Sequence, residues 1–323
     1  MKTGRCCILY NKPREGATAD ELDILEQVEW VEQHLAKMNI PTYRYGITTN
    51  FMEEMAHLAI NRPDYVFNLV ESINNKGELL YFIPALLNMY SIPYTGNPLE
   101  AMFITTSKKL TVSILQDAGI SNPGYYSPAL PSSLTPGNKY IIKPIWEDGS
   151  MGITADSVFT YDKSKDSWLS GFKESHWMIQ DFIDGREFNI SVMNGKNGPE
   201  VLPAAEMTFV GYEEHRPRIV DFKAKWEEGS FEYENTVRKF PGENLESILV
   251  TRLEKVALDS WKVFGLKGYA RVDMRVDSNN IPRVIEVNAN PCISHNGGFV
   301  AATEAAGYDF TDVLSWIIDD MNF

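Results

Sequence analysis

Two carboxylates and an amide are spaced along residues 271–291 so that a β-hairpin would bring their side chains together. Apolar and polar residues alternate over 270–276 and 283–287, and the turn-forming segment 277–280 lies between them, which predicts a β-hairpin. If residue 277 pairs with residue 282, Asp273 lies opposite Glu286, with Cβ atoms about 5 Å apart. Strand alternation then places Asn288 on the same face as Glu286.

These three side chains favour a site for a hard divalent cation. Facing carboxylates destabilise a sheet and raise the pKa of one partner unless a cation lies between them. Mg²⁺ uses few protein oxygens and leaves its remaining positions to water and phosphate oxygens. Asp273, Glu286 and Asn288 therefore predict a metal–nucleotide site. The alternative is a solvated hairpin whose acidic residues are ordinary surface groups.

Length, composition and charge limit the class of protein. A chain of 323 residues that is 44% hydrophobic is long enough for two or three packed units. The net charge of −14 argues against nucleic acid or an anionic membrane as the main partner, since both attract basic surfaces. No segment approaches about 20 consecutive apolar residues, so we expect a cytoplasmic protein outside the membrane. Three cysteines without metal-type spacing indicate reduced thiols.

Strand-like and helix-like segments alternate over the first hundred residues. Apolar patterns predict strands at 6–10, 42–47 and 65–70, and helices at 19–38, 51–60 and 78–90. In the first helix, the apolar residues at helical spacing are Leu22, Leu25, Val28, Val31 and Leu35. Such alternation implies a parallel sheet that binds ligands at the carboxyl ends of its strands. Glu71 follows the third strand, where it could contact a substrate amino group or serve only as a loop residue.

Residues 99–153 offer groups that suit phosphate. Residues 99–118 predict one mainly helical segment with Lys108 near its middle, and a surface lysine of this kind is usually only solvated. The strand 140–144 delivers Lys143 at its end, and the loop that follows contains two glycines and Ser150. Glycine lets the backbone approach a phosphate, while Ser150 and the lysine supply a donor and a charge. A plain hairpin turn is the alternative.

Residues 177–264 predict three features in turn. They are a strand that could contact a nucleotide base, an irregular lid and a long helix. In the strand 177–182 and the turn 183–187, Gln180 and backbone amides could meet a purine edge. Glu187 could accept from ribose hydroxyls or be only a hairpin charge. Regular periodicity fades over 209–241, which is typical of a functional lid, and 245–264 predicts an amphipathic helix.

The ordered set of these motifs resembles ATP-grasp enzymes and, within that superfamily, D-alanine:D-alanine ligases. The motifs are Ile142-Lys143-Pro144 before a Gly/Ser loop, Gln180-Asp181-Phe182-Ile183-x-Gly-Arg-Glu187, and Arg271-x-Asp273 followed by Glu286-x-Asn288-x-x-Pro291. The resemblance covers nearly the whole chain. It implies an ATP-grasp fold of mixed α/β and α+β class. Its parts would be an N-terminal Rossmann-like parallel-sheet domain at 1–98, a central subdomain at 99–183, and a C-terminal subdomain with lid and metal site at 184–323.

The resemblance also assigns roles residue by residue. It implies that Lys108, Lys143 and Ser150 bind phosphate and that the lid lysine Lys225 reaches the γ-phosphate. It implies contacts to the base and ribose from Gln180, Asp181, Ile183 and Glu187. It also implies the magnesium ligands Asp273, Glu286 and Asn288, and a catalytic Arg271 that stabilises the tetrahedral intermediate. The implied cofactors are ATP and Mg²⁺, as two ions for which Mn²⁺ can substitute. The implied reaction joins a carboxylate to an amine through an acyl phosphate, with amino acids or small peptides as substrates. A homodimer is implied by the resemblance alone.

The sequence departs from the ligase pattern around the amino-acid substrates. The family's N-terminal Gly-Gly-x-Ser-x-Glu segment is absent, and Cys292 stands where a glycine follows the metal ligands. Ser294 and His295 lie close to the site along the chain, and His295 could touch the acceptor carboxylate. Two alternatives to D-alanine ligation therefore stay open. One is the same chemistry on other amino acids or small peptides, and the other is a non-ligating ATP-binding protein with a degenerate acceptor site.

Overall fold

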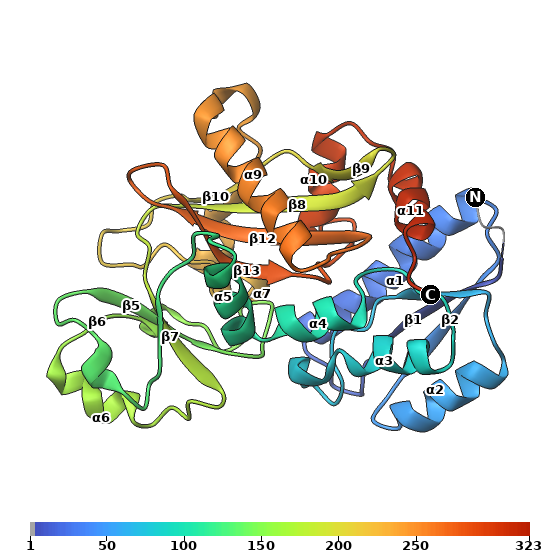
Figure 1. The fold of residues 1–323 in the computed structure, drawn as a ribbon, viewed down its shortest axis with the longest axis horizontal. Coiled ribbons are helices and arrows are strands. Elements are labelled where there is room, and N and C mark those ends of the chain that lie inside the picture. The colour runs from blue at the N-terminus through green and yellow to red at the C-terminus, as the bar shows by residue number, and fades with distance from the viewer. Residues whose placement is uncertain (1–3) are drawn as a thin grey trace.

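The computed structural model describes residues 4–323, which form three β-sheets with helices around them (Figure 1). The first sheet has the order β2-β1-β3 and is parallel, as the alternating pattern predicted. Its strands are β1 (Cys6–Asn11), β2 (Thr42–Ile47) and β3 (Tyr65–Asn68). Its helices are α1 (Ala19–Lys37), α2 (Phe51–Ile60) and α3 (Phe82–Met89).

Two predictions for this part of the chain were wrong in detail. Leu22 and Leu25 are exposed, and Ile24 joins Val28, Val31 and Leu35 in the buried stripe of α1. Positions 24, 28, 31 and 35 form a continuous helical face. The buried face therefore begins at Ile24 and not at Leu22 or Leu25. The predicted helix 78–90 is also interrupted, since a 3₁₀ turn at Gly77–Leu79 precedes α3.

The predicted helix 99–118 is two helices that meet at Ser107. They are α4 (Leu99–Thr106) and α5 (Lys108–Asp117). Ser107 has extended backbone angles, and its hydroxyl accepts from the N–H of Leu110, so it caps α5. Lys108 is therefore the first residue of α5 and not a mid-helix residue. This position turns its side chain into the molecule, where Lys108 is only 5% exposed.

A four-stranded antiparallel sheet with the order β4-β7-β5-β6 lies at the left of Figure 1. Its strands are β4 (Tyr125–Tyr126), β5 (Lys139–Pro144), β6 (Val158–Thr160) and β7 (Trp177–Asp181), and the short helix α6 (Asp166–Leu169) flanks it. Tyr140, Ile142 and Ile179 face its small core. Strand alternation therefore directs Lys143 and Gln180 to the opposite face.

The third sheet has the order β11-β10-β8-β12-β13, with β9 paired to β8. Its strands are β8 (Arg186–Gly195), β9 (Gly198–Val201), β10 (Ala205–Phe209), β11 (Thr236–Lys239), β12 (Tyr269–Val276) and β13 (Pro282–Asn288). The helix α9 (Ser247–Val263) covers one face, and Leu249, Leu253, Ala257 and Trp261 are its buried residues toward the core. The predicted turn 183–187 is shorter than expected, because β8 already begins at Arg186.

The β12–β13 hairpin confirms the predicted pair through a different register near the turn. Val276 pairs with Pro282, whereas the pattern predicted residue 277 opposite 282. A β-bulge then leaves Ile285 without a strand partner and brings Asp273 opposite Glu286. The extra residue lets Val284 and Val287 both face the core while Glu286 faces the other side.

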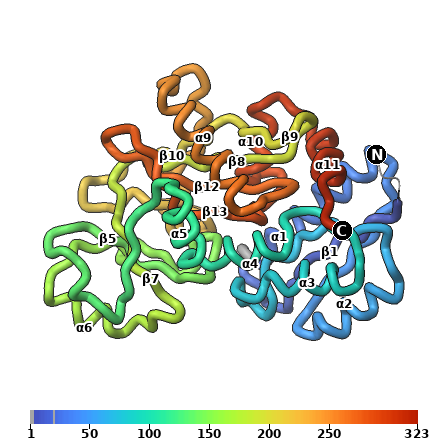
Figure 2. Tube along the Cα trace, in the orientation of Figure 1, coloured from blue at the N-terminus to red at the C-terminus, as the bar shows by residue number. Residues whose placement is uncertain are grey.

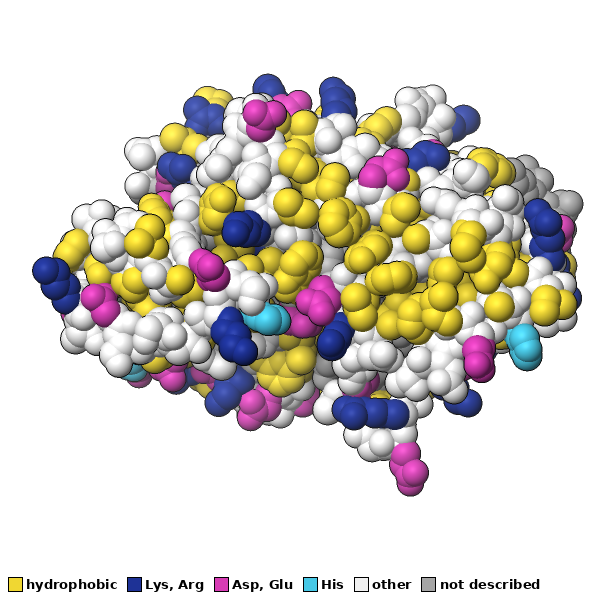
Figure 3. Space-filling model, turned by 60° about the horizontal axis from the view of Figure 1, so that its bottom comes forward, with side chains coloured by type: hydrophobic (Ala, Val, Ile, Leu, Met, Phe, Trp, Pro, Cys, Tyr) yellow, Lys and Arg dark blue, Asp and Glu magenta, His cyan; other side chains and the backbone are white. Residues whose placement is uncertain are grey.

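The last two helices pack beside the N-terminal elements, where α11 contacts α1 and both helices contact β8. The helices α10 (Gly298–Ala305) and α11 (Phe310–Asp319) share one core with α1 and β1, and Figure 2 shows the end of the chain beside the N-terminal elements. The division into parts at residues 98 and 183 stays a prediction. In the chain from residue 4 onward, no helix is long and apolar enough to cross a membrane. On the face shown in Figure 3, Lys and Arg side chains lie scattered among acidic ones.

Candidate active site

Asp273 lies on the polar face of β12 and is held by cationic and amide groups. Its two oxygens receive a bidentate ion pair from Arg271, with Nε–Oδ1 at 2.7 Å and Nη2–Oδ2 at 2.8 Å. Asn189, its partner on β8, donates to Oδ1 at 2.8 Å. Burial alone would lower the pKa of Arg271, but the Asp273 carboxylate outweighs burial and raises it. Arg271 therefore keeps its charge at neutral pH.

Glu286 lies across the hairpin from Asp273 and pairs with Lys108. The distance from Lys108 Nζ to Glu286 Oε1 is 2.8 Å, and Nζ also reaches Asp148 Oδ1 at 3.1 Å and the carbonyl of Glu147. Burial opposes the charge on Glu286, but the ammonium of Lys108 outweighs it and holds the pKa of Glu286 well below its usual range. Burial, together with repulsion from Glu286, raises the pKa of Asp148. The pKa values of the two carboxyls thus move in opposite directions, which favours the charged form of Glu286 and the protonated form of Asp148.

Lys143 extends from the four-stranded sheet to the bulge in β13. Its Nζ donates to the carbonyl of Ile285 at 3.0 Å, and its side chain is buried. Burial, followed by repulsion from Lys108, lowers the pKa of Lys143 to about 8. Lys108 and Lys143, from different segments, thus converge on the facing carboxylates. The lysines and the carboxylates lie between the two antiparallel sheets.

The predicted base and ribose residues lie in β7, at the start of β8 and in the loop between these strands, and they differ in their hydrogen-bond partners. Glu187 is buried and accepts from Nη1 of Arg275 at 2.8 Å, while Arg275 Nε donates to the carbonyl of Ile183 at 2.7 Å. Burial raises the pKa of Glu187, because the charge of Arg275 offsets only part of the effect of burial. The Asp181 carboxylate instead accepts from the N–H of Gly124 at 3.0 Å, so it fixes the strand end.

Gln180 differs from these residues because one end of its amide has no partner. The residue is 1% exposed, and its Nε2 is buried without a hydrogen-bond acceptor. A buried donor without a partner costs on the order of 1–3 kcal/mol, so such a group calls for a ligand.

The segment predicted as a lid, 209–241, is irregular only over 210–235, because β10 ends at Phe209 and β11 (Thr236–Lys239) follows. It contacts the loop after β5, and its role as a lid stays a prediction. It contains the short helices α7 (Phe222–Trp226) and α8 (Phe231–Asn235). The indole N–H of Trp226 donates to the carbonyl of Gly149 at 2.9 Å, and the hydroxyl of Ser150 donates to the carbonyl of Val220 at 2.6 Å. Burial, followed by repulsion from Arg271, lowers the pKa of Lys225. The charge of Arg271 therefore reaches Lys225, the predicted lid lysine.

The predicted substrate residues fall into two environments. Glu71 accepts from Gln27 Nε2 at 2.8 Å, and the same Nε2 donates to Asp23 at 3.1 Å. Ser294 is buried beside Cys292, with Oγ and Sγ 3.0 Å apart. His295 is exposed and packs against Trp30, with ring centroids 4.7 Å apart and the ring planes tilted by 43°.

Several residues of this site were missed in the sequence. Asn189, Asp148 and Arg275 each contact a predicted residue, and Gln27 ties α1 to Glu71 and, through its Oε1, to the N–H of Ile293. The position of Asn189 could have been found, because it alternates with buried Phe188 and Ile190 on a strand next to β12. Arg275 could have been found in the same way, because it alternates with Asp273 on β12. Asp148 and Gln27 depend on how distant segments are placed, which no local pattern describes.

The surroundings of the three predicted metal ligands show whether these side chains suit Mg²⁺. Asp273 and Glu286 each hold a side-chain cation in this structure, so the pair attracts the positive charge that Mg²⁺ would supply. Asn288 Oδ1 accepts from the N–H of Asn290 at 2.8 Å and keeps a second lone pair. Within residues 4–323, no group of three or more His, Cys, Asp or Glu side chains is arranged to hold a metal. The predicted set is consistent with this, since it uses two carboxylates and one amide.

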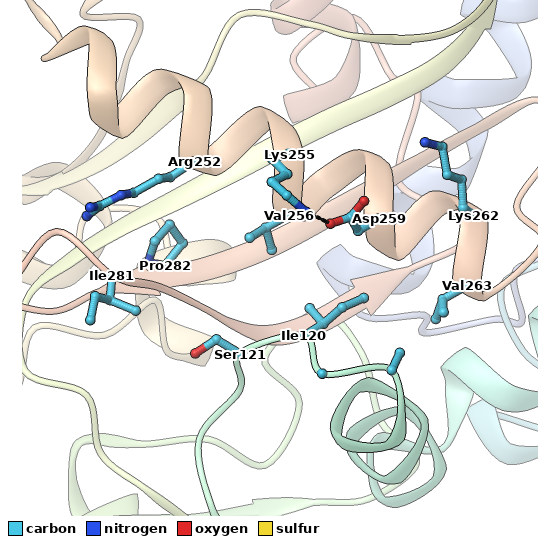
Figure 4. Close-up of a pocket in the computed structure, with 12 residues that line it drawn as sticks. Ile120, Ser121, Arg252, Lys255, Val256, Asp259, Lys262, Val263, Ile281 and Pro282 are labelled. Atoms are coloured by element: carbon cyan, nitrogen blue, oxygen red, sulfur yellow. Dashed lines mark hydrogen bonds and ion pairs between the residues drawn. The ribbon is translucent and has the colours of Figure 1, made fainter.

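A separate cavity of about 620 Å³ lies between α9, residues 118–121 and the start of β13 (Figure 4). Ile120, Val256 and Ile281 give it apolar walls, and Arg252 stands at one end. None of the predicted site residues lines it.

Comparisons with known proteins agree on one family. A family model described as "D-ala D-ala ligase C-terminus" matches residues 137–319. The uncharacterized protein y4sG of Sinorhizobium fredii is 26% identical over 256 residues, 79% of this chain and 73% of that protein. The D-alanine–D-alanine ligase of Aquifex aeolicus is 27% identical over 241 residues, 73% of this chain and 76% of that one. The crystal structure of D-alanine–D-alanine ligase from Bacillus anthracis complexed with ATP has a TM-score of 0.73 at 19% identity, covering 99% of this chain and 97% of that one.

Proposed function

Since the chain belongs to the D-ala D-ala ligase C-terminus family, whose members are ATP-grasp ligases, we propose that it joins a carboxylate to an amine with ATP. The predicted family resemblance and the mixed α/β fold with an N-terminal parallel sheet are confirmed. The activity, its cofactors and its substrates are the proposal.

One observation carries this proposal, namely the convergence of cations on the facing carboxylates. Lys108 lies 2.8 Å from Glu286, Arg271 pairs with Asp273, and Lys143 reaches the bulge between them. A non-ligating nucleotide-binding protein has no use for a buried arginine beside the lid lysine, because those groups stabilise charge at a reacting carbonyl.

ATP would lie between the two antiparallel sheets. Its base would meet Gln180 and the backbone at Ile183, and its ribose would meet Glu187. Its phosphates would meet Lys108, Lys143 and Ser150. The bound triphosphate would replace Asp148 as a partner of Lys108, since the phosphate loop and that lysine are already in contact. Lys225 of the lid would neutralise the γ-phosphate.

Asp273, Glu286 and Asn288 would hold Mg²⁺, which when bound would neutralise charge on the phosphate oxygens. Lys108 and Arg271, which balance the two carboxylates in this structure, would then turn toward the phosphates and the reacting carbonyl.

The reaction would run in two steps. A carboxylate oxygen of the first substrate attacks the γ-phosphorus, and the bond from phosphorus to the β–γ bridging oxygen breaks, which gives an acyl phosphate and ADP. The amine of the second substrate attacks the acyl carbon, loses a proton to solvent and expels phosphate. Arg271 would stabilise the oxyanion of the tetrahedral intermediate, and the lid would exclude water that otherwise hydrolyses the acyl phosphate.

The amine-bearing end of the first substrate would face a different set of residues from the family's usual glutamate. Asp23 and Glu71, joined by Gln27, would be its nearest carboxylates. We therefore propose amino acids or small peptides as substrates, with D-alanine as one candidate among them. The consumption of ATP suits a cytoplasmic protein, and a homodimer is carried over from the family as part of the proposal.

The test is phosphate release from Mg-ATP by the purified protein, screened against D- and L-amino acids singly and in pairs. Asp273→Ala serves as the blank, and Asp277→Ala, in the turn of the same hairpin, serves as the matched control. Release that needs an amino acid and disappears only in Asp273→Ala is the expected result. ATP binding without release in every mixture, dipeptides included, would favour the non-ligating alternative.

A further inference from the structure

The unpartnered amide of Gln180 carries an inference about the nucleotide, which rests on the proposed function. Gln180 lies in β7, where it pairs with Tyr125 of β4 and Ile141 of β5. Its side chain is on the same face of the sheet as Lys143, two residues beyond Ile141 on β5. Diagonal neighbours of this kind lie about 7–8 Å apart. A nucleotide whose phosphates meet Lys143 would therefore bring its base near Gln180.

The amide differs from a carboxylate in what it can offer to a purine. A glutamate in this position would only accept hydrogen bonds when ionised, whereas Gln180 has an oxygen that accepts and an NH₂ group that donates. The six-position of adenine carries an amino group, which needs an acceptor. The six-position of hypoxanthine or guanine carries a carbonyl oxygen, which needs a donor.

The surroundings leave Gln180 able to present either end. Its Nε2 is buried and has no acceptor among the described residues, so no protein hydrogen bond holds this end of the amide in one orientation. Rotation about the last side-chain torsion exchanges the oxygen and the NH₂ group at little cost, because that torsion is broad and roughly two-fold. Each orientation satisfies one of the two purine types.

We propose that Gln180 makes the base pocket accept 6-oxopurine as well as 6-aminopurine nucleoside triphosphates. With ATP, Gln180 accepts from the six-amino group through its oxygen. With inosine triphosphate, it turns and donates to the six-oxygen through Nε2. Replacement by glutamate removes the donor and sets a negative charge against the six-oxygen, while it keeps the acceptor that adenine needs.

The experiment compares dissociation constants for ATP and inosine triphosphate, each with Mg²⁺, by calorimetry on the whole chain. Inosine triphosphate serves as the probe because its base differs from adenine in the six-substituent and the proton that this places on N1. We expect the wild type to bind the two within about tenfold of each other, and Gln180→Glu to raise the ratio of the inosine to the adenosine constant at least about tenfold, the effect of one lost hydrogen bond.

Two further variants keep the result interpretable. Gln116→Glu makes the same change on the exposed surface of α5 and should leave the ratio unchanged, which controls for the added charge. Gln180→Leu removes both hydrogen-bonding ends and should weaken the binding of both nucleotides, so that it supplies the test if Gln180→Glu does not fold. A ratio that rises less than tenfold in Gln180→Glu, or a leucine variant that binds both as the wild type does, overturns the inference.

The outcome separates this inference from the proposed function. If the protein binds ATP and releases phosphate while the ratio is insensitive to Gln180, the ligase proposal stands and the inference on the base is wrong. If neither nucleotide binds the wild type, the proposed function fails and this inference fails with it.

Discussion

Replacement of Lys143 by methionine should stabilise the protein without nucleotide and abolish its response to ATP. Burial, followed by repulsion from Lys108, lowers the pKa of Lys143 from 10.5 to about 8. At 1.36 kcal/mol per pH unit, this difference corresponds to about 3 kcal/mol of unfavourable free energy at neutral pH. Methionine removes that cost but leaves the carbonyl of Ile285 without its donor, which costs about 1 kcal/mol. The expected net gain in unfolding free energy is about 2 kcal/mol.

The pH dependence gives this prediction a sign that can be checked. Between pH 8 and 10.5 the unfolded chain keeps the Lys143 proton while the folded chain has lost it, so wild-type stability rises with pH across this window. The advantage of Lys143→Met should therefore shrink by about 2 kcal/mol between pH 7 and pH 9.5. Urea unfolding at both pH values measures it.

The matched control is Lys139→Met, at the exposed start of the same strand. Lys139 Nζ lies 3.6 Å from Asp184, and both side chains are more than half exposed, so its replacement should change stability by less than about 0.5 kcal/mol. Saturating Mg-ATP should raise the unfolding midpoint of the wild type and of Lys139→Met but not of Lys143→Met. A Lys143→Met protein that is less stable than the wild type at pH 7, or whose advantage is the same at both pH values, would refute this account of the buried lysine.

Three further changes test the site and the core. Arg271→Lys keeps the charge beside Asp273 but loses the bidentate geometry, so kcat for phosphate release should fall about 100-fold while the Kd for ATP, measured by calorimetry, changes less than about threefold; an equal loss in Kd would contradict a role in catalysis. Trp226→Phe removes the 2.9 Å bond from the lid to Gly149 and should raise the KM for ATP about fivefold, together with faster tryptic cleavage of the lid; unchanged cleavage would argue against the lid contact. Leu253→Ala, at a position 1% exposed, should lower the unfolding free energy by about 3 kcal/mol, whereas Ile248→Ala on the same helix, 67% exposed, should change it by less than about 0.5 kcal/mol.

The sequence predicted the centre of the site because its geometry is local. Asp273 and Glu286 are joined by one hairpin, so strand alternation was enough to pair them. The pairing survived an incorrect register at the turn, because the adjacent apolar residues Val284 and Ile285 mark a bulge that restores it. Two apolar residues in a row on an otherwise alternating strand are the signal that would have predicted the bulge.

The rest of the site depends on contacts between distant segments. The place of Lys108 was missed, because helix propensity continues through residues 99–118 and only the capping hydroxyl of Ser107 divides it. Asp148 and Gln27 contact predicted residues across long sequence separations, which no periodic pattern encodes. The exposure of Leu22 and Leu25 shows the same limit on the surface, since several stripes fit one helix and only the sheet beneath selects among them.

The packing of α11 against α1 and β8 has a consequence for how the chain is made. Ile8 of β1 and Val313, Leu314 and Ile317 of α11 belong to one buried core, although about 300 residues separate them. A ribosome that adds about 5–20 residues per second needs roughly 15–60 s to synthesise that interval. The side of α1 that packs against α11 therefore stays uncovered during almost the whole of translation, although α1 itself covers its face of the first sheet early. We expect the nascent chain to depend on chaperone binding over that interval, and a ribosome stalled before residue 310 to present an aggregation-prone apolar surface.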